Sequence, residues 1–117
     1  MGYSRAVRAG SSVFVAGCVG IRDDGSYPPD LRGQTSRCLE RVADALRAFE
    51  LTLGSIVRIR IYTTQIDRWE EIASVVGPSF AETRPANLLV GVAALVDPRA
   101  MIEIEADAWT GGTDRTE

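Results

Sequence analysis

The chain has 117 residues, 45% hydrophobic and 25% charged, which is typical of one folded domain and excludes a disordered or fibrous segment. Thirteen basic against sixteen acidic residues give a net charge of -3, which argues against nucleic acid or an anionic membrane as a partner. Histidine and lysine are both absent, which removes the commonest metal ligand, the commonest general base and Schiff-base lysine chemistry.

The two cysteines and the lack of long apolar runs indicate in which cellular compartment the protein is expected. Cys18 and Cys38 have no CxxC spacing, so neither a zinc site nor a disulfide framework is indicated, and reduced thiols are expected. No apolar signal core follows Met1, and no apolar run is long enough to span a bilayer. We therefore expect a cytoplasmic protein without membrane association, metal or other cofactor.

The chain opens with the pattern of a β-hairpin. Residues 12–17 form a β-branched and aromatic run that ends in a glycine, which predicts a strand that is apolar on both faces. Residues 3–9 are its expected partner, with the turn at Gly10 and Ser11. Residues 23–29 are dense in turn formers and predict a loop that ends this first unit.

An amphipathic helix is predicted next, over residues 30–49. Its apolar side chains recur at the helical i, i+3, i+4, i+7 spacing, and they are Leu39, Val42, Ala43, Ala45, Leu46 and Phe49. The remaining positions carry charged side chains, so this helix is expected to bury one face and leave the other in solvent.

Residues 56–62 alternate with period two, which predicts a strand with Val57, Ile59 and Ile61 on one face. The opposite face carries two arginines and Tyr62. We expect Arg58 and Arg60 to be paired with Glu105 or Asp107 across the sheet.

A second helix and two more strands complete the pattern. Asp67 and Glu70 have the spacing of a capping box and predict a helix of about 12 residues, with Trp69 packed on its apolar face. After Pro85, residues 88–95 and 101–106 read as two strands around a turn at residues 97–98.

The resulting order is β-β-α-β-α-β-β, an α+β fold in which both helices can pack on one face of a mixed sheet. The other face would be too mixed for a solvent surface and too small for a core of its own. It is expected to carry Phe14, Leu89, Gly91, Ala93, Arg58 and Tyr62. Self-association through this open face is the simplest way to cover it.

Several segments together resemble one known family over nearly the whole chain. Residues 3–10 and 13–17 resemble the opening hairpin of the Rid (YjgF-like, reactive-intermediate deaminase) proteins, and residues 84–95 and 102–106 resemble their C-terminal signature. The resemblance implies a chorismate-mutase-like fold and a homotrimer with a central barrel and three clefts between subunits. We therefore expect one Rid-like domain over residues 1–117, with residues 110–117 as a flexible tail.

The resemblance also implies a reaction. The archetype hydrolyses small enamines and imines, such as 2-aminoacrylate, to a keto acid and ammonia, and an arginine after its Pro-Ala motif holds the substrate carboxylate. Here that position is Asn87, whose neutral amide cannot replace the two charge-assisted hydrogen bonds of a guanidinium. We expect a deaminase-type hydrolase for a small molecule other than the typical 2-aminoacrylate.

Further positions of the implied cleft have changed. Ala16, Gly17 and Cys18 stand where the archetype usually has Ser-Gly-Gln, and Leu89 stands where a cysteine is often found. With Asn87 and Tyr3, these residues are the expected substrate-binding positions of a remodelled site.

Two residues are candidates for catalysis. Glu103 matches the family glutamate thought to orient or activate the hydrolytic water; alternatively Glu103, Glu105 and Asp107 form a solvated or arginine-paired strip on one face. Cys18 could act as a nucleophile, although no histidine is present to activate it, or it is a small buried thiol at a strand end.

Two binding positions also have simpler readings. Tyr3 could stack on or hydrogen-bond a planar imine, or it belongs to a frayed terminus. Asn87 could bond a ligand carbonyl or amide, or satisfy nearby backbone groups.

Three functions therefore compete. The first is the imine or enamine hydrolase, and the second is a non-catalytic trimer that binds or senses a small ligand. Endoribonuclease activity, attached to some family members, is disfavoured by the acidic balance and by the absence of histidine and lysine.

Overall fold

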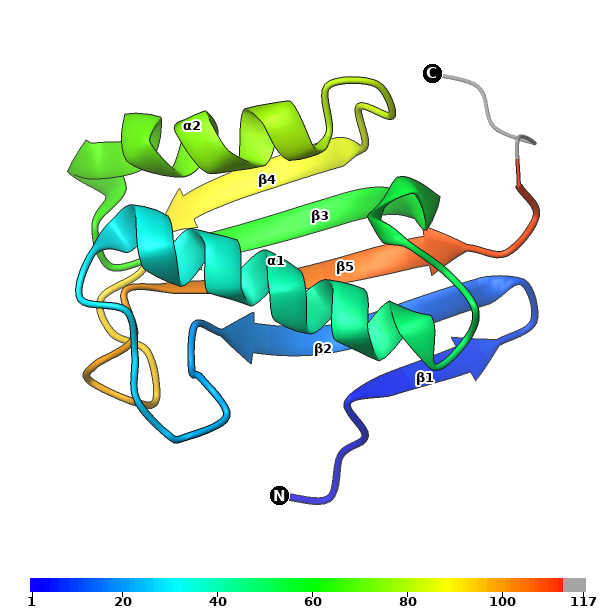
Figure 1. Cartoon of the computed structure of the whole chain (residues 1–117), viewed down its shortest axis with the longest axis horizontal. Helices are drawn as coiled ribbons and strands as arrows, with labels where there is room; N and C mark the ends of the chain where they lie inside the picture. The colour runs from blue at the N-terminus through cyan, green and yellow to red at the C-terminus, as the bar shows by residue number, and fades with distance from the viewer. Residues whose placement is uncertain (113–117) are drawn as a thin grey trace.

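The structure is a computed structural model that describes residues 1–112. In that part of the chain, five strands and two α-helices follow in the order β1 (Ala6–Ala9), β2 (Ser12–Val19), α1 (Leu31–Arg47), β3 (Ile56–Thr63), α2 (Trp69–Ser79), β4 (Ala86–Gly91) and β5 (Ile102–Trp109). Short 3-10 turns at Leu53–Ser55 and Ile66–Arg68 precede β3 and α2. Both α-helices lie on one face of the sheet (Figure 1), so the predicted α+β arrangement is confirmed.

The strand order across the sheet is β1-β2-β5-β3-β4. The first two strands form the expected hairpin, and β5 pairs antiparallel with both β2 and β3. In contrast, β4 pairs parallel with β3, so β3 separates β4 from β5. The segment around Asp97 is therefore a crossover between two non-adjacent strands, and the first of them ends at Gly91, earlier than predicted.

The core lies between the sheet and the helices. Alternate residues of β5 are buried beneath α1, and Ile59 and Ile61 of β3 join them. One prediction for β3 was wrong in detail, because the register shifts between Ile56 and Arg58. As a result Ile56, and not Val57, is fully buried with the core residues of this strand.

Two predicted features of the helix face need correction. Leu89 and Gly91 lie opposite Ile61 and Thr63, so they belong to the helix-covered face and not to the open face. The expected capping box is absent, because α2 begins at Trp69 without a side-chain cap and Asp67 lies in the preceding 3-10 turn.

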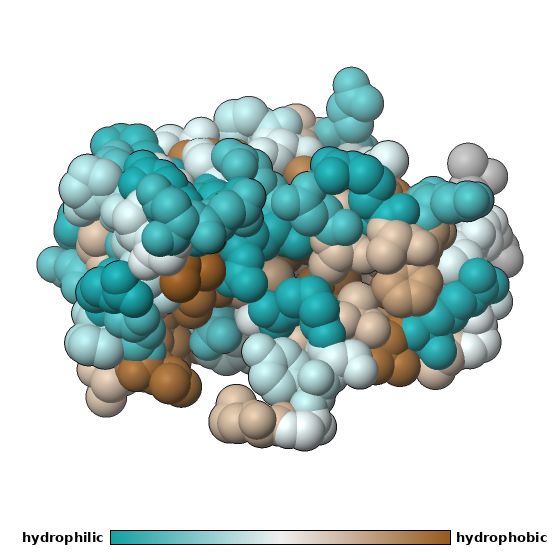
Figure 2. Space-filling model, turned by 60° about the horizontal axis from the view of Figure 1, so that its bottom comes forward, coloured by the Kyte–Doolittle hydropathy of each residue, from teal (hydrophilic) through white to brown (hydrophobic). Residues whose placement is uncertain are grey.

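Trp69 also departs from its expected packing role, since it is 49% exposed. Exposed apolar side chains are scattered over several elements, and in the view of Figure 2 brown apolar groups stand among teal hydrophilic ones. Within residues 1–112, no helix is long and apolar enough to cross a membrane. The tail predicted over residues 110–117 lies mostly in residues 113–117, outside the described residues.

Candidate functional site

An irregularity in β2 shapes the candidate site. The pairing of β2 with β5 shifts register between Val15 and Cys18, so Ala16 and Gly17 together form a bulge. Because the bulge inserts one extra residue, Cys18 turns to the same helix-covered face as Val15. Bulges of this kind redirect side chains beside functional sites in many sheets.

Cys18 is therefore a core residue. Its thiol is completely buried and donates to the Ala16 carbonyl oxygen at 3.4 Å. Burial raises the pKa of this thiol, and the opposing influence of Arg5 and Arg41 does not reverse that effect. A buried, protonated thiol is a poor nucleophile, so the structure favours the packing interpretation of Cys18.

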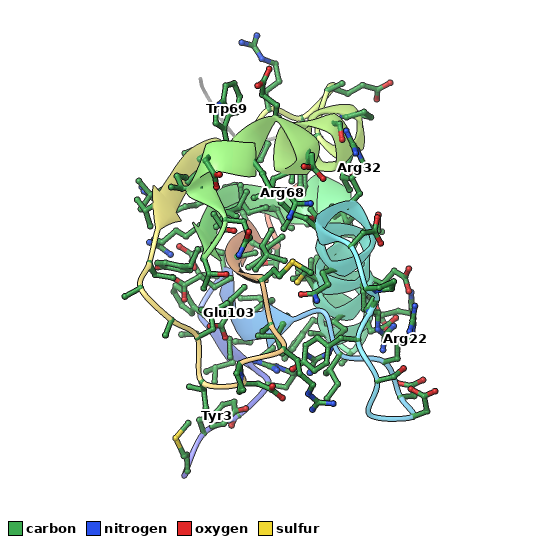
Figure 3. All side chains as sticks on the ribbon, turned by 90° about the vertical axis from the view of Figure 1, so that its left-hand side faces the viewer. Tyr3, Arg22, Arg32, Arg68, Trp69 and Glu103 are labelled. Carbon is green, nitrogen blue, oxygen red and sulfur yellow. The ribbon has the colours of Figure 1, made fainter. Side chains whose placement is uncertain are left out.

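Glu103 lies on the open face, directly against the bulge. A Cβ placed on Gly17 would be 2.5 Å from Oε2 of Glu103, so any larger residue at this position would force the carboxylate to move from its present place. Glu103 is half-buried, and among residues 1–112 its carboxylate has no hydrogen-bond or ion-pair partner. Figure 3 shows Glu103 and Tyr3 on the side of the sheet away from α1, whose Arg32 is labelled on the other side.

Arg5 is a residue of the site that was not predicted from the sequence. Its guanidinium donates to the Gly17 carbonyl oxygen, and its Nε is buried without a hydrogen-bond partner in the described part of the chain. It also lies 5.6 Å from the centroid of the Tyr3 ring. Arg5 therefore places a positive charge at the carbonyl of the same glycine whose α-carbon is covered by Glu103. Its only sequence signal is its place two residues after Tyr3.

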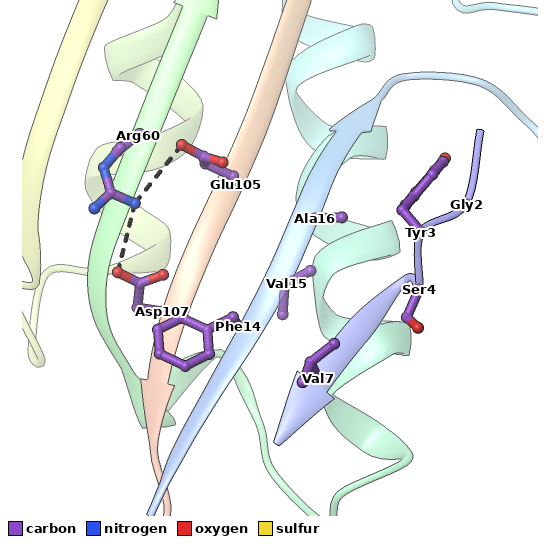
Figure 4. A pocket seen from close by; sticks show the side chains of 10 residues that line it. All are labelled: Gly2, Tyr3, Ser4, Val7, Phe14, Val15, Ala16, Arg60, Glu105 and Asp107. Carbon is purple, nitrogen blue, oxygen red and sulfur yellow. Dashed lines mark ion pairs between the residues drawn. The ribbon is translucent and has the colours of Figure 1, made fainter. Parts of the chain in front are cut away.

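A broad hollow of about 940 Å³ lies on the open face (Figure 4), and its lining includes Tyr3 and Ala16 but not Glu103, Gly17 or Arg5. Tyr3 and Ala16 line it at one side, and Arg60 lines it at the other. Arg60 pairs with Glu105 at 3.6 Å and with Asp107 at 3.4 Å, while Arg58 is 4.0 Å from Asp107. The predicted pairing of the two arginines with Glu105 and Asp107 is confirmed.

Asn87 and Leu89 are not part of this corner. Asn87 lies opposite Ile59 on edge strand β4 and lines a separate hollow of about 290 Å³ beneath α2, together with Val76, Phe80 and Arg84. Glu103 is on a different strand, on the opposite face of the sheet, with β3 in between. One chain therefore brings together Tyr3, Ala16, Gly17 and Glu103, and leaves Asn87 and Leu89 apart.

The acidic and thiol side chains of the described residues are the candidate ligands for a metal ion. Within residues 1–112, no group of three or more His, Cys, Asp or Glu residues could hold a metal ion. The chemistry available at the corner is that of one carboxylate, one guanidinium and one phenol.

The fold and this corner indicate one class of protein: a small α+β domain whose open sheet face carries, on β5, a carboxylate that lies against a bulge of β2 and has no partner within residues 1–112. The model of the Endoribonuclease L-PSP family matches residues 1–110. The chain belongs to this family, and the predicted resemblance to the Rid and YjgF proteins is confirmed.

Curated relatives and solved structures support the same family assignment. A RutC family protein of Pyrococcus horikoshii is 29% identical over 92% of this chain and 86% of its own length. The RutC family protein YjgH of Escherichia coli is 33% identical over 77% of this chain and 70% of its own.

Among solved structures, a Mycobacterium tuberculosis member of the YjgF/YER057c/UK114 family is 42% identical, with a TM-score of 0.84 over 92% of this chain and 86% of that one. The structure of E. coli TdcF with bound serine is 31% identical, with a TM-score of 0.86 over 92% and 87%.

Proposed function

We propose that this protein is a metal-free hydrolase of the deaminase type, acting on a small imine, enamine or related compound. Family membership supports a small-molecule hydrolase or binding role in general. The finer proposal depends on Glu103, which acts as the general base that activates a water molecule. In the reducing cytoplasm that we propose as its location, Cys18 and Cys38 remain free thiols.

The observation that carries this proposal is the isolation of the Glu103 carboxylate. A structural carboxylate is normally satisfied by a cation or by hydrogen bonds, as Glu105 and Asp107 are. Glu103 instead faces the open side without a partner in residues 1–112, against a glycine that makes room for it. A general base must have its oxygen atoms available to a water molecule in this way.

We further propose that the working unit is a homotrimer with its clefts between subunits. The open face carries Phe14 at 46% exposed and Leu88 at 46% exposed beside the paired charges, and a neighbouring copy would cover them. The positions expected to bind substrate also require it, because Asn87 and Glu103 of one chain face opposite sides of the sheet. A cleft containing both must combine residues of two subunits.

The substrate is proposed to differ from 2-aminoacrylate. Asn87 offers a neutral amide where the archetype holds a carboxylate with arginine, and Leu89 adds an apolar side chain beside it. Loss of a charge-assisted clamp costs about 1.5 to 3 kcal/mol, which is roughly tenfold to a hundredfold in affinity.

A panel of small imines with and without a carboxylate group tests this function. The expected result is catalytic release of ammonia that survives exhaustive chelation, with a higher kcat/KM for the uncharged imines. Light scattering should give three times the chain mass of 12.7 kDa. A monomer at micromolar concentration, or an activity that one metal restores after chelation, would overturn the proposal.

A second function is favoured by one finding: the similar TdcF structure has serine bound, and serine is an amino acid rather than an imine. The alternative is a non-catalytic trimer that binds or senses a small molecule. Calorimetry distinguishes the two, because this alternative predicts saturable binding of an amino acid with no ammonia released from any imine.

RNA cleavage, which the family's name mentions, is not proposed for this chain. The net charge of -3 and the absence of lysine disfavour binding to a phosphate backbone. The absence of histidine removes the usual general base.

A further inference from the structure

We infer that Gln34, a buried residue of α1, is a positioning residue that fixes the strand start from which Glu103 projects. Gln34 does not line the open face. It is only 1% exposed and lies in the core beneath the crossover that leads into β5. The inference rests on the proposed function, since it assigns a role in placing the proposed base.

The carboxamide of Gln34 uses both its donor and its acceptor groups. Its Nε2 donates to the Pro28 carbonyl oxygen at 3.1 Å and to the Arg99 carbonyl oxygen at 3.0 Å. Its Oε1 accepts from the backbone N–H of Met101 at 2.8 Å. The Gln34 side chain therefore connects the loop at Pro28 with the loop at Arg99. Its third hydrogen bond is to Met101, two residues before Glu103.

Met101 is held from the opposite side by β3. Its carbonyl oxygen accepts from Oγ1 of Thr63 at 2.7 Å and from the N–H of Thr64 at 3.1 Å. Thr63 is completely buried. Both polar backbone groups of Met101 are thus fixed by α1 on one side and β3 on the other, immediately before β5 begins.

The hydrogen bonds to Met101 matter because, among residues 1–112, no hydrogen bond or ion pair holds the Glu103 side chain itself. Its carboxylate has no partner within residues 1–112, so its position depends on the backbone that carries it and on the contact with Gly17. A displacement of about 1 Å at a catalytic group can cost on the order of a hundredfold in rate. A fully satisfied buried amide is a rigid way to prevent such a displacement.

The adjacent residue supplies a matched control. Thr35 is also completely buried, but its hydroxyl donates at 2.8 Å to the Leu31 carbonyl oxygen in the same helix, and within residues 1–112 it makes no hydrogen bond to the crossover. Gln34→Leu and Thr35→Val each remove buried hydrogen bonds from neighbouring positions of α1. Only the first removes the connection to Met101.

The experiment compares kcat, KM and thermal stability of the wild-type protein, Gln34→Leu, Thr63→Val and Thr35→Val. We expect kcat to fall about tenfold to a hundredfold in Gln34→Leu and Thr63→Val, with KM nearly unchanged. Thr35→Val should lose stability and keep its kcat. Equal kcat values in all folded variants, or a loss of kcat that follows stability alone, would overturn the inference. If Gln34→Leu does not fold, Thr63→Val decides.

A second readout does not require turnover. The carboxyl carbon of Glu103 is observed by NMR in each variant at one fixed pH. We expect its chemical shift to change in Gln34→Leu and Thr63→Val, because the backbone that carries it is displaced, and to stay constant in Thr35→Val. If the wild type releases no ammonia from any imine, the proposed function fails, while an unchanged Glu103 chemical shift in all variants refutes the role of Gln34 separately.

Discussion

The two ends of β5 show what a strand does with the same residue type in two settings. Glu103, Glu105 and Asp107 alternate along one face of the strand. At the far end, Glu105 and Asp107 are paired with Arg60, and Glu105 also accepts a hydrogen bond from Tyr62 at 2.8 Å. At the near end, Glu103 has no such partner in the described residues and lies on a glycine.

The difference comes from the neighbouring strands and not from β5. On one side, Tyr62 lies opposite Glu103 in the register, but its hydroxyl points to Glu105, which raises the pKa of the phenol. On the other side, β2 places Val19 opposite Glu103 in the register and Gly17 of the bulge against its carboxylate, and neither residue has a side chain that can pair with a carboxylate. An alternating acidic pattern can therefore form an ion-pair network at one end and leave an available carboxylate at the other.

The largest expected effect comes from replacing one carboxylate at each end of β5, in turn, with the corresponding amide. Glu103→Gln should lower kcat by about 10² to 10⁴ with little change in stability, because general base catalysis is lost and no ion pair among residues 1–112 is broken. Glu105→Gln should keep kcat and cost about 0.5 to 1 kcal/mol of stability, since its pairs are partly exposed. Steady-state kinetics and thermal denaturation measure both. Equal kcat values for the two variants would show that Glu103 and Glu105 do not differ in their role in catalysis.

Gly17→Ala tests the contact that leaves room for Glu103. The new Cβ would overlap Oε2, and the flexible carboxylate must move away. We expect kcat to fall about tenfold or more, with a change in stability below about 1 kcal/mol. Gly54→Ala is the matched control, because its Cβ would make an ordinary 3.4 Å contact with Thr52 in the turn before β3. The same kcat in both variants would show that the glycine has no role in catalysis.

The same contrast explains which parts could be predicted from the sequence. Helical periodicity predicted α1 within a few residues, because burial of one helix face is a local pattern. The place of β5 between β2 and β3 could not be read locally, since pairing partners are distant in sequence. The bulges in β2 and β3 then decided which residues face the core: Cys18 is the buried thiol that was one of its two interpretations, while Val57 leaves the face predicted for it.

For the site, the sequence supplied Glu103 only through the family resemblance. Periodicity alone favoured a solvated or arginine-paired strip, and that interpretation is correct for Glu105 and Asp107. Arg5 could not be found, because its contact with Gly17 exists only where the bulge exposes a carbonyl oxygen. Leu89 was placed on the wrong face since the parallel register of β4 with β3 was not known.

Asn87→Arg extends the comparison to the other edge of the sheet. A guanidinium at this position should bind the carboxylate of iminopyruvate or 2-aminoacrylate across the proposed cleft. We expect KM for these compounds to fall about tenfold or more with kcat little changed, because the clamp binds ground and transition states alike. Asn87→Gln, which lengthens the side chain without adding charge, should show no gain. Rapid deamination of iminopyruvate by the wild type would show that Asn87 is no obstacle.

The smallest expected effect concerns Asp97, whose carboxylate pairs with Arg99 in its own loop and also accepts a hydrogen bond from Tyr27 at 3.3 Å. Asp97, in the crossover before β5, accepts hydrogen bonds from the side chain and backbone of Arg99, and these lower its pKa from 3.8 to about 2. A lowered pKa in the folded state means that the ionised form stabilises the fold. This stabilisation is complete above about pH 4, and it is lost as the pH falls through about 2. Asp97→Asn should therefore have a lower Tm than the wild type at pH 5, and the difference should shrink on acidification to pH 2. Asp97 lies in the crossover loop and not on the open face with Glu103. We therefore expect the pH profile of kcat to stay unchanged in Asp97→Asn. A shifted profile would mean that the Asp97–Arg99 pair influences Glu103.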